Sequence, residues 1–475
     1  MSAVTELAQF LATALEAARV VVLPAPRLEA AALLRASRKC EAWLLEQPPH
    51  ELGPSATLLG LGVAEATSLP ACGEAALEAH ASRSRALPRA VHPAADPSLA
   101  ARVPLVVFGH AFAPGASVEE PWSEHADGRA VTPRWTYLRE GDRAVIAFAA
   151  TSEPWPGRAA VIGAELEALL CAPAAPAPMD CRRVAVDPAS PAAFHDRVEA
   201  ARAAIASGSL SKVVCSRRAS VSAERDFEPE AVLERLVPSA ALRFFVRRGA
   251  SVLVGATPER LFRKTGLRVS TEALAGTRAK GPQASEQALL TSVKDNHEHA
   301  PVVEAIVERL RGLGAEVRAE PSPRLKRAAN VVHLRTEIEA VVPDDVSAVA
   351  LLDALHPTPA VGGTPREAAE AFIQAHEPPR GWYSGPLGWI DARGDADVHV
   401  MLRCGLLRGA RAWVFAGGGI VATSDPPAEH AETELKMAPL LRALGASPLS
   451  GALEEPREPR EAGRVGAPVG AGSTA

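Results

Sequence analysis

The order of strand-like and helix-like segments in this 475-residue chain predicts an α+β fold, a two-layer α/β sandwich with large antiparallel sheets. Strand-like runs alternate with long helical runs, but they lack the regular strand–helix–strand order of a parallel sheet. Three strand-like runs also follow one another closely, at 242–248, 251–257 and 266–277, which is typical of an antiparallel meander. A hydrophobic fraction of 47% is enough to fill the core of such a fold.

Composition excludes several classes of function. A formal net charge of −5 argues against a surface for nucleic acid or an anionic membrane. No run of eighteen apolar residues is present, and the first twenty residues resemble an amphipathic helix rather than a signal peptide. The six cysteines show no zinc-ligand spacing, so we expect reduced thiols in a cytoplasmic protein.

The first lobe is predicted to cover residues 1–171. It is expected to end in a helix at 161–170, and the Pro- and Ala-rich segment 172–180 is typical of a linker. Its strand-like runs lie at 43–47, 57–66, 104–112, 133–140 and 144–150.

The second lobe is predicted to cover residues 182–445. Its first helix is expected to begin at Ser190 with Pro191 in the first turn, and Gly208 would end it. Strands are expected at 211–221 and 331–342, and a helix near 346–355. A long helix is expected at 285–314, and Thr364, Pro365 and Glu367 fit a capping box. Residues 446–475 lack apolar periodicity and are expected to be a disordered tail.

The segment 415–437 is the stretch around which the chain is organised. An apolar strand leads into Gly417, Gly418 and Gly419, and a helix follows that carries Glu429, Glu432 and Lys436. Spacings of three and four place these three side chains on one helix face. Glycines allow a ligand to approach backbone amides, and two carboxylates on one face can hold a hard cation. Alone, the segment also fits an ordinary surface helix behind a tight turn.

Four further charged residues lie in apolar or strand-end surroundings. Lys212 begins an apolar strand, Glu259 lies at a strand-end turn, Glu298 is on the long helix, and Arg403 lies within an apolar strand. Each of them alone is most simply a surface or snorkelling charge. The histidines at 297, 299, 333 and 356 are most simply hydrogen-bonded structural imidazoles.

Nine segments, taken together and in this order, resemble the chorismate-utilising enzymes, the family of isochorismate, anthranilate, aminodeoxychorismate and salicylate synthases. They are SKVVCSRR, GATPERLF, TEALAGTRAKG, KDNHEH, HPTPAVGG, YSGPLGWID, VMLRCGLL, FAGGGIV and SDPPAEHAETELK, and they cover residues 190–445 almost continuously. The resemblance implies the anthranilate/aminodeoxychorismate synthase-type chorismate-binding fold, with two lobes that share sheets and an active site between them.

The resemblance also implies roles for individual residues. Lys212 resembles the family's general base and Glu259 its general acid. The carboxylates expected at a Mg²⁺ ion are Glu298 and Glu432, with Glu429 as an outer partner. The residues expected to contact the substrate chorismate are Gly276, Thr277, His356, Ala360, Arg403, Gly417, Gly419 and Lys436.

The branch of the family depends on a few positions. Ala275 stands where one type of aminodeoxychorismate synthase carries a nucleophilic lysine, and Leu274 with Ala360 resembles the isochorismate synthase pattern. We therefore expect Mg²⁺-dependent addition of water at ring carbon C2 of chorismate with loss of the C4 hydroxyl.

Three alternatives stay open. They are an ammonia-using anthranilate or aminodeoxychorismate synthase large subunit, which would need a glutamine amidotransferase partner, a salicylate synthase, and a non-catalytic chorismate binder. For the preferred function no obligate protein partner is expected, and a monomer is the default.

Overall fold

The structure, a computed structural model, describes residues 3–49, 55–70, 73–115, 120–150, 159–172, 184–187, 190–236, 242–281, 283–327 and 331–446. The predicted linker beyond residue 172 and the predicted tail beyond residue 446 lie outside the described residues. None of the helices within these ranges is long and apolar enough to cross a membrane.

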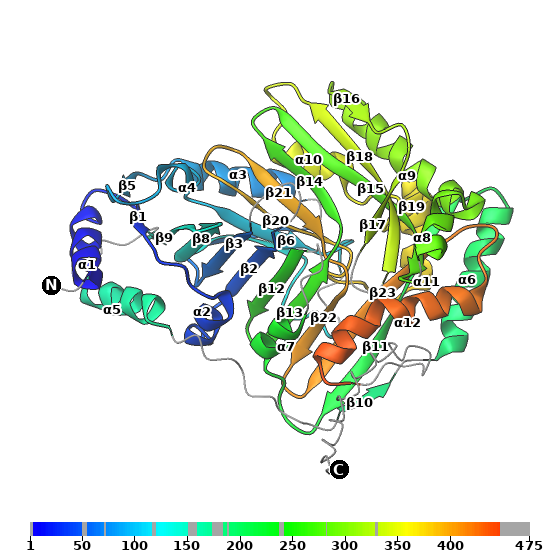
Figure 1. The fold of residues 1–475 in the computed structure, drawn as a ribbon, viewed down its shortest axis with the longest axis horizontal. Coiled ribbons are helices and arrows are strands. Elements are labelled where there is room, and N and C mark those ends of the chain that lie inside the picture. Colours follow the sequence, from blue (N-terminus) through cyan, green and yellow to red (C-terminus); the bar gives the residue numbers. More distant parts are fainter. Residues whose placement is uncertain are drawn as a thin grey trace, which may run out of the picture.

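Two sheets form the framework of the molecule (Figure 1). The larger sheet has thirteen strands, in the order β10 (Val184–Asp187), β11 (Lys212–Ala223), β23 (Arg411–Ile420), β22 (Cys404–Arg408), β13 (Ser251–Thr257), β12 (Leu242–Arg248), β2 (Ala42–Gln47), β3 (Ala56–Leu61), β8 (Trp135–Glu140), β9 (Arg143–Ala149), β1 (Val20–Pro24) and β5 (Arg89–Val91), with β19 (Gly363–Thr364) paired to the start of β11. The smaller sheet has ten strands, in the order β16 (Glu316–Ala319), β18 (Val331–Val341), β15 (Arg268–Ala279), β14 (Arg260–Thr265), β21 (Ala396–Val400), β20 (Pro386–Ile390), β6 (Val106–His110), β7 (Gly128–Thr132) and β4 (Glu65–Ser68), with β17 (Arg324–Arg327) beside β18.

Nearly all strand pairing is antiparallel. Among the described strands only β1 and β5 pair in parallel. The predicted α+β class with large antiparallel sheets is therefore confirmed.

Both sheets contain strands from both sides of the predicted linker. In the larger sheet β12 pairs with β2, and Phe244 lies opposite Leu45. In the smaller sheet β20 pairs with β6, and Gly388 lies opposite Phe108. Each sheet thus combines strands from before residue 172 with strands from the later part of the chain.

The main cores lie between the sheets and on their outer faces. Successive residues of a strand point to opposite faces. Phe244 accordingly packs between the sheets with Trp43 and Leu387, whereas its neighbour Phe245 packs under helices. The helices are α1 (Ala3–Ala14), α2 (Ala30–Ala36), α3 (Glu74–Arg85), α4 (Pro97–Ala100), α5 (Ala159–Leu170), α6 (Pro191–Ala206), α7 (Pro229–Arg235), α8 (Gln283–Leu290), α9 (Val293–Gly312), α10 (Ala348–Leu355), α11 (Arg366–His376) and α12 (Pro426–Ala443). Helices α6, α8, α9, α11 and α12 gather at the end of the molecule away from α1 (Figure 1).

The predicted meander is wrong in one respect. β12 and β13 form a hairpin in the larger sheet, but the chain then crosses to the smaller sheet, where β14 pairs with β15 and β21. The crossing falls at Pro258 and Glu259, between the end of β13 and the start of β14. Alternating patterns reveal strands but not the sheet to which each belongs, and β14 was not expected at all.

Two helix predictions also need correction. The helix expected at 285–314 is two helices, because the Ser292 hydroxyl accepts a hydrogen bond from the backbone N–H of Asp295 and starts α9. Pro301 lies inside α9, as expected. The capping box at Thr364 does not form, since Thr364 belongs to β19 and Pro365 is the N-cap of α11.

Candidate active site

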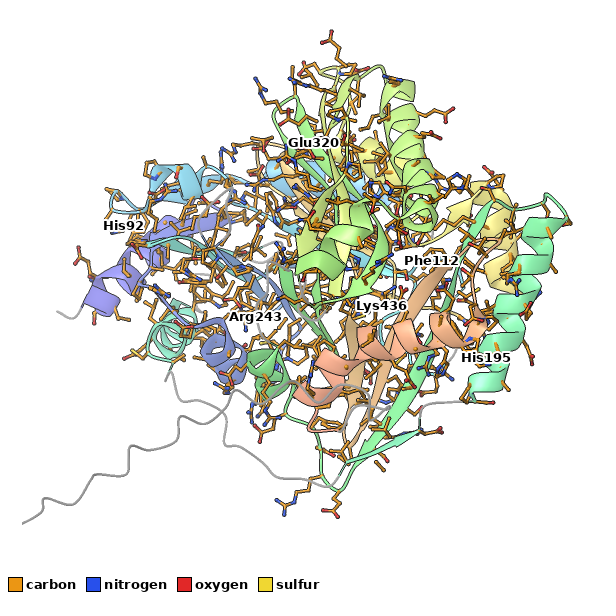
Figure 2. The ribbon with its side chains drawn as sticks, turned by 45° about the vertical axis from the view of Figure 1, so that its right-hand side comes forward. His92, Phe112, His195, Arg243, Glu320 and Lys436 are labelled. Atoms are coloured by element: carbon orange, nitrogen blue, oxygen red, sulfur yellow. The ribbon has the colours of Figure 1, made fainter. Side chains whose placement is uncertain are left out.

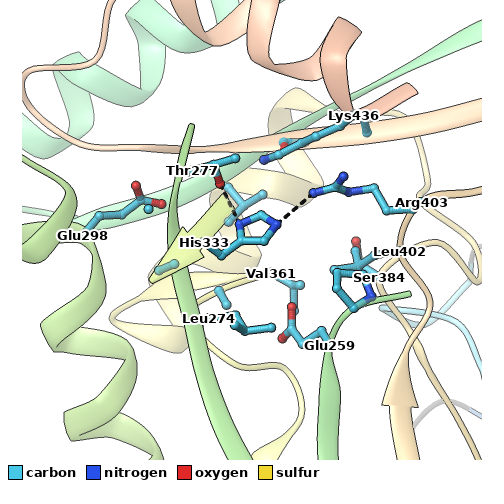
Figure 3. Close-up of a pocket in the computed structure, with 18 of the residues that line it drawn as sticks. Glu259, Leu274, Thr277, Glu298, His333, Val361, Ser384, Leu402, Arg403 and Lys436 are labelled. Carbon is cyan, nitrogen blue, oxygen red and sulfur yellow. Dashed lines mark hydrogen bonds between the residues drawn. The ribbon is translucent and has the colours of Figure 1, made fainter. Parts of the chain in front are cut away.

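A pocket between the two sheets collects most of the predicted site residues (Figure 3). It is lined by Lys212, Val214, Pro258, Glu259, Leu274, Ala275, Gly276, Thr277, Glu298, His333, Ala360, Val361, Tyr383, Ser384, Leu402, Arg403, Ala416, Gly417, Gly419 and Lys436. All of these residues lie after residue 182. Among the described residues, the second part of the chain therefore supplies the whole lining, which differs from the expected site between the two lobes.

The pairing of β11 with β23 builds one wall. Val214 lies opposite Gly419, and residues directly opposite in antiparallel strands share a face. Lys212 therefore faces the pocket together with Gly417 and Gly419. A Cβ atom on Gly419 would lie 2.3 Å from Glu298 Oε1 and 3.0 Å from Lys212 Cε. Glycine at 419 thus leaves the space that the lysine and the carboxylate occupy.

Lys212 and Glu298 form an ion pair across this space. The Lys212 Nζ atom lies 3.2 Å from Glu298 Oε1, and the exposed fractions of the two side chains are 2% and 15%. A buried ammonium needs a partner of opposite charge, because its desolvation is otherwise costly. The pair joins the start of β11 to α9, and it places a base candidate beside a metal-ligand candidate.

Glu259 lies on a different wall, where the chain crosses between the sheets. The Thr358 hydroxyl donates a hydrogen bond of 3.4 Å to its Oε1 atom, and the residue is 6% exposed. Burial and the nearby Glu272 carboxylate raise the pKa of Glu259 to about 7. A carboxyl group with this pKa carries a proton for an appreciable part of the time at neutral pH.

The cations nearest Glu272 are bonded to that carboxylate. Lys326 Nζ lies 2.5 Å from Glu272 Oε1 and 2.7 Å from the carbonyl oxygen of Pro258, the residue before Glu259. Arg335 Nε lies 2.5 Å from the other Glu272 oxygen. This arrangement fixes the crossing segment and leaves Glu259 without a direct ion pair among the described residues.

A third wall carries Thr277, His333 and Arg403 in a row (Figure 3). Arg403 Nη2 lies 3.3 Å from His333 Nε2, and Thr277 Oγ1 lies 3.0 Å from His333 Nδ1. Burial and then the Arg403 charge hold the pKa of His333 well below its usual range, so the ring is neutral. Because arginine only donates, Nε2 accepts and the ring proton is on Nδ1. The Thr277 oxygen accepts a hydrogen bond from this N–H group, which leaves the Thr277 hydroxyl hydrogen available to a ligand.

Backbone conformation places two of these groups. Gly276 has a φ of +74° at a bulge between Ala275 and Thr277, and glycine adopts this conformation without strain. Arg403 has a φ of +50°, which is uncommon for a residue with a side chain. It lies just before β22, and its unusual backbone turns the guanidinium toward the pocket.

Helix α12 reaches the pocket at an open edge of β23. β22 pairs with β23 only as far as Val414, so the carbonyl oxygen of Gly417 accepts a hydrogen bond of 2.8 Å from Lys436 Nζ. Lys436 also lies 2.6 Å from Glu432 Oε1. Figure 2 shows Lys436 projecting from α12 toward the centre of the molecule.

Glu429 lies behind the sheet. A Cβ atom on Gly418 would lie 3.0 Å from Glu429 Oε2, and the residue between Gly417 and Gly419 faces away from the pocket. The other Glu429 oxygen accepts a hydrogen bond of 2.7 Å from the Ser424 hydroxyl. The structure therefore separates Glu429 from Glu298, although the helical spacing grouped it with Glu432.

The carboxylates can be tested as a Mg²⁺ site. The described residues contain no cluster of three His, Cys, Asp or Glu side chains close enough to hold a metal ion. Glu298 and Glu432 instead each pair with a lysine of the pocket wall. Two carboxylates suit Mg²⁺ when waters and substrate oxygens complete its coordination, so this donor set fits, with Glu429 outside it.

Three predicted residues, His356, Glu429 and Glu432, lie outside the lining, and several lining residues were missed. His356 is not part of the lining; its ring packs edge-on against His110 and Phe112. Ala360 does line the pocket. Tyr383, Ser384 and His333 were not predicted as site residues. β15 pairs with β18 and places His333 beside Thr277, but no local signal in the sequence predicts this pairing.

Comparison with known proteins agrees with the geometry. A family model for "Chorismate binding enzyme" matches residues 17–445. The salicylate biosynthesis isochorismate synthase of Pseudomonas aeruginosa is 40% identical over 356 residues, which are 72% of this chain and 75% of that protein. Isochorismate synthase EntC of Escherichia coli is 36% identical over 261 residues, which are 53% of this chain and 67% of that protein.

The fold has a close counterpart among solved structures. The structure of MenF, the menaquinone-specific isochorismate synthase from Escherichia coli, matches with a TM-score of 0.73 at 26% identity. The match covers 91% of this chain and 99% of that chain. The range matched by the family model includes the whole pocket, whose lining runs from Lys212 to Lys436.

Proposed function

This chain belongs to the family of chorismate-binding enzymes, and we propose that it is an isochorismate synthase, which adds water at ring carbon C2 of chorismate as the C4 hydroxyl leaves. The relatives that are 36–40% identical and carry this name support the activity. The observation that carries the proposal is a buried carboxyl group, Glu259, with a pKa raised to about 7 on one wall and a buried lysine, Lys212, on another.

Glu259 acts as the general acid. A group that gives up a proton near neutral pH works best when its pKa is close to that pH. It protonates the C4 hydroxyl, which leaves as water. Lys326 and Thr358 hold the crossing segment and the carboxyl group in place for this transfer.

Lys212 acts as the general base. As a neutral amine, its Nζ atom takes a proton from the water that forms the new C2–oxygen bond. The ring would lie between the Lys212 wall and the Glu259 wall. One water enters and one leaves, so chorismate is isomerised without a net change of atoms.

The carboxylates of the substrate bind two further cations of the pocket, Arg403 and Lys436. Arg403 and Lys436 reach the pocket from different elements, and the Thr277 hydroxyl is available as a further donor. Charge-assisted hydrogen bonds of this kind are roughly twice as strong as neutral ones. They orient the ring before the proton transfers occur.

Glu298 and Glu432 would hold a Mg²⁺ ion. When bound, this ion supplies Lewis-acid polarisation of the ring carboxylate. Both side chains must then give up part of their present bonds to Lys212 and Lys436. Until that exchange, the two ion pairs balance the charges of these four side chains.

The source of the new oxygen tests the proposal. Turnover of chorismate in ¹⁸O-labelled water is expected to place the label at C2 of isochorismate. With ammonium also supplied, no nitrogen should enter the product, because Leu274 and Ala360 offer no polar group to steer ammonia. An aminated product formed at a comparable rate would instead favour an anthranilate or aminodeoxychorismate synthase. Binding without turnover would favour a non-catalytic chorismate binder.

A further inference from the structure

A second cavity adjoins the active pocket behind Tyr383. It has a volume of about 160 Å³, and Tyr383 lines both cavities. The same face of β11 runs past both, since Val214 lines the first, and Ser216 and Arg218 line the second. The full lining is Ser190, Ala193, Phe194, Arg197, Ser216, Arg217, Arg218, Pro378, Pro379, Arg380, Tyr383 and Phe415.

The cavity lies beside a gap in the edge of β11. β19 covers this edge at Lys212 and Val213, and β10 covers it from Ser220 onward. Between them, no described strand pairs with β11 on that side. Three side chains bond its backbone instead: Arg380 to the Val214 carbonyl at 2.7 Å, Glu377 to the Ser216 N–H at 2.7 Å, and Arg197 to the Ser216 carbonyl at 2.5 Å.

The positive charge at this cavity exceeds the negative charge. Arg380 is matched by Glu377 at 2.7 Å, and Arg217 has Glu434 at 3.7 Å. Arg197 and Arg218 form no ion pair among the described residues.

Within the described chain, the side chains of Arg197 and Arg218 donate hydrogen bonds only to backbone carbonyls. Arg197 donates to the carbonyls of Ser216 and His376, and Arg218 donates to that of Glu120 at 3.5 Å. Both arginines are half-buried, so an anion bound there would keep part of its Coulomb attraction.

The remaining surface of the cavity is aromatic. Phe194, Tyr383 and Phe415 are each less than 5% exposed. The rings of Tyr383 and Phe415 stack with centroids 5.5 Å apart and an interplanar angle of 19°. An apolar cavity of about 150 Å³ is large enough to bind benzene. The cavity is therefore of the size that accepts one small ring.

We propose that this cavity is a binding site for a small aromatic monocarboxylate, distinct from the chorismate pocket. The ring would pack against Phe194, Phe415 and Tyr383, and the carboxylate would bind Arg197 and Arg218. Arg197 bonds the carbonyl of Ser216, and Arg218 leaves the same strand two residues later, about 7 Å along it. The two side chains therefore line the cavity near each other, so that one carboxylate can contact both guanidinium groups.

Calorimetric titration of benzoate into the full-length protein, without chorismate, tests the site. Benzoate is expected to bind, and benzyl alcohol, which lacks the charge, is expected to bind at least about tenfold more weakly. Arg218→Gln should weaken benzoate binding at least about tenfold, and this variant should fold, because Arg218 makes only one long hydrogen bond to the described chain. Arg197→Gln should have a similar effect, with a melting temperature measured alongside because Arg197 also bonds the backbone.

Arg403→Gln is the matched control, since Arg403 belongs to the other pocket. It should leave benzoate binding unchanged. Loss of binding in this control would place benzoate in the chorismate pocket and overturn the proposal. Unchanged binding in Arg218→Gln, or no binding to the wild-type protein, would also overturn it. The titration involves no turnover, so its outcome is separate from that of the proposed function.

Discussion

The active pocket contains two glutamates, the half-buried Glu298 and the buried Glu259, whose surroundings differ. Glu298 lies 3.2 Å from the ammonium of Lys212, whereas Glu259 has no ion pair among the described residues and a pKa raised to about 7. Lys326, the cation that most lowers the pKa of Glu259, is bonded to Glu272 instead. Burial, together with the bonding of Lys326 to Glu272, leaves Glu259 able to hold a proton, whereas Glu298 keeps a cation beside it.

Glu272 shows what directly bonded cations do to the pKa of a glutamate. Its side chain is 8% exposed, and burial alone would raise its pKa, but Lys326 and Arg335 lower the pKa below the usual value. Its fixed negative charge in turn raises the pKa of Glu259. One carboxylate is thus held ionised so that its neighbour can stay protonated.

Removing either the proposed base or the proposed acid should lower turnover strongly. Lys212→Ala and Glu259→Gln are each expected to lower kcat by about 10²–10⁴-fold, the usual contribution of a general base or acid. Chorismate binding should be largely kept, because Arg403 and Lys436 stay in place. Steady-state kinetics and calorimetric titration of chorismate check both statements. A loss of less than about tenfold in kcat for either variant would contradict its assigned role.

Removing a cation-binding carboxylate should also stop turnover. Glu298→Gln and Glu432→Gln are each expected to abolish activity, and treatment with a chelator should do the same until Mg²⁺ is restored. Glu429→Gln is the matched control and should be milder, because Glu429 faces away from the pocket. Full turnover after metal removal would contradict the metal assignment, and an equal loss in Glu429→Gln would bring that residue into the site.

The smallest expected effect is a shift in the pH profile. Glu259 donates a proton only while protonated, so turnover should fall as the pH rises through about 7. Lys326 lowers the pKa of Glu259. Lys326→Met should therefore move this fall in turnover, the alkaline limb of the pH profile, to higher pH by on the order of one unit. Lys326→Arg keeps the charge and should leave the limb nearer its original place. A limb that moves to lower pH in Lys326→Met would show that Lys326 acts by another route.

Local patterns predicted most strands, because alternation along a strand depends on a few neighbouring residues. The charged residues of the pocket were predicted from the resemblance of their motifs to the chorismate-utilising enzymes, since each of them alone fits a surface charge. Lys212, Glu259, Glu298, Arg403 and Lys436 all line the pocket.

Long-range pairing could not be predicted in the same way. The crossing at Glu259 depends on β14 joining β21, and the contact between His333 and Arg403 joins residues that are 70 positions apart. Glu429 shares a helix face with Glu432, but the position of α12 against β23 turns the first toward Gly418 and the second toward Lys436. Spacing along one helix carries no information about that position.

The pairing of β12 with β2 has a consequence for the synthesis of the protein. Arg243 follows its cross-strand partner Glu46 by 197 residues. At a ribosome speed of about 5–20 residues per second, β2 would wait about 10–40 seconds for β12 to emerge. During that time its edge exposes unpaired N–H and C=O groups, which can pair with other chains. The newborn N-terminal segment is therefore the part of this protein most in need of a chaperone, and expressed alone it would keep that exposed edge permanently.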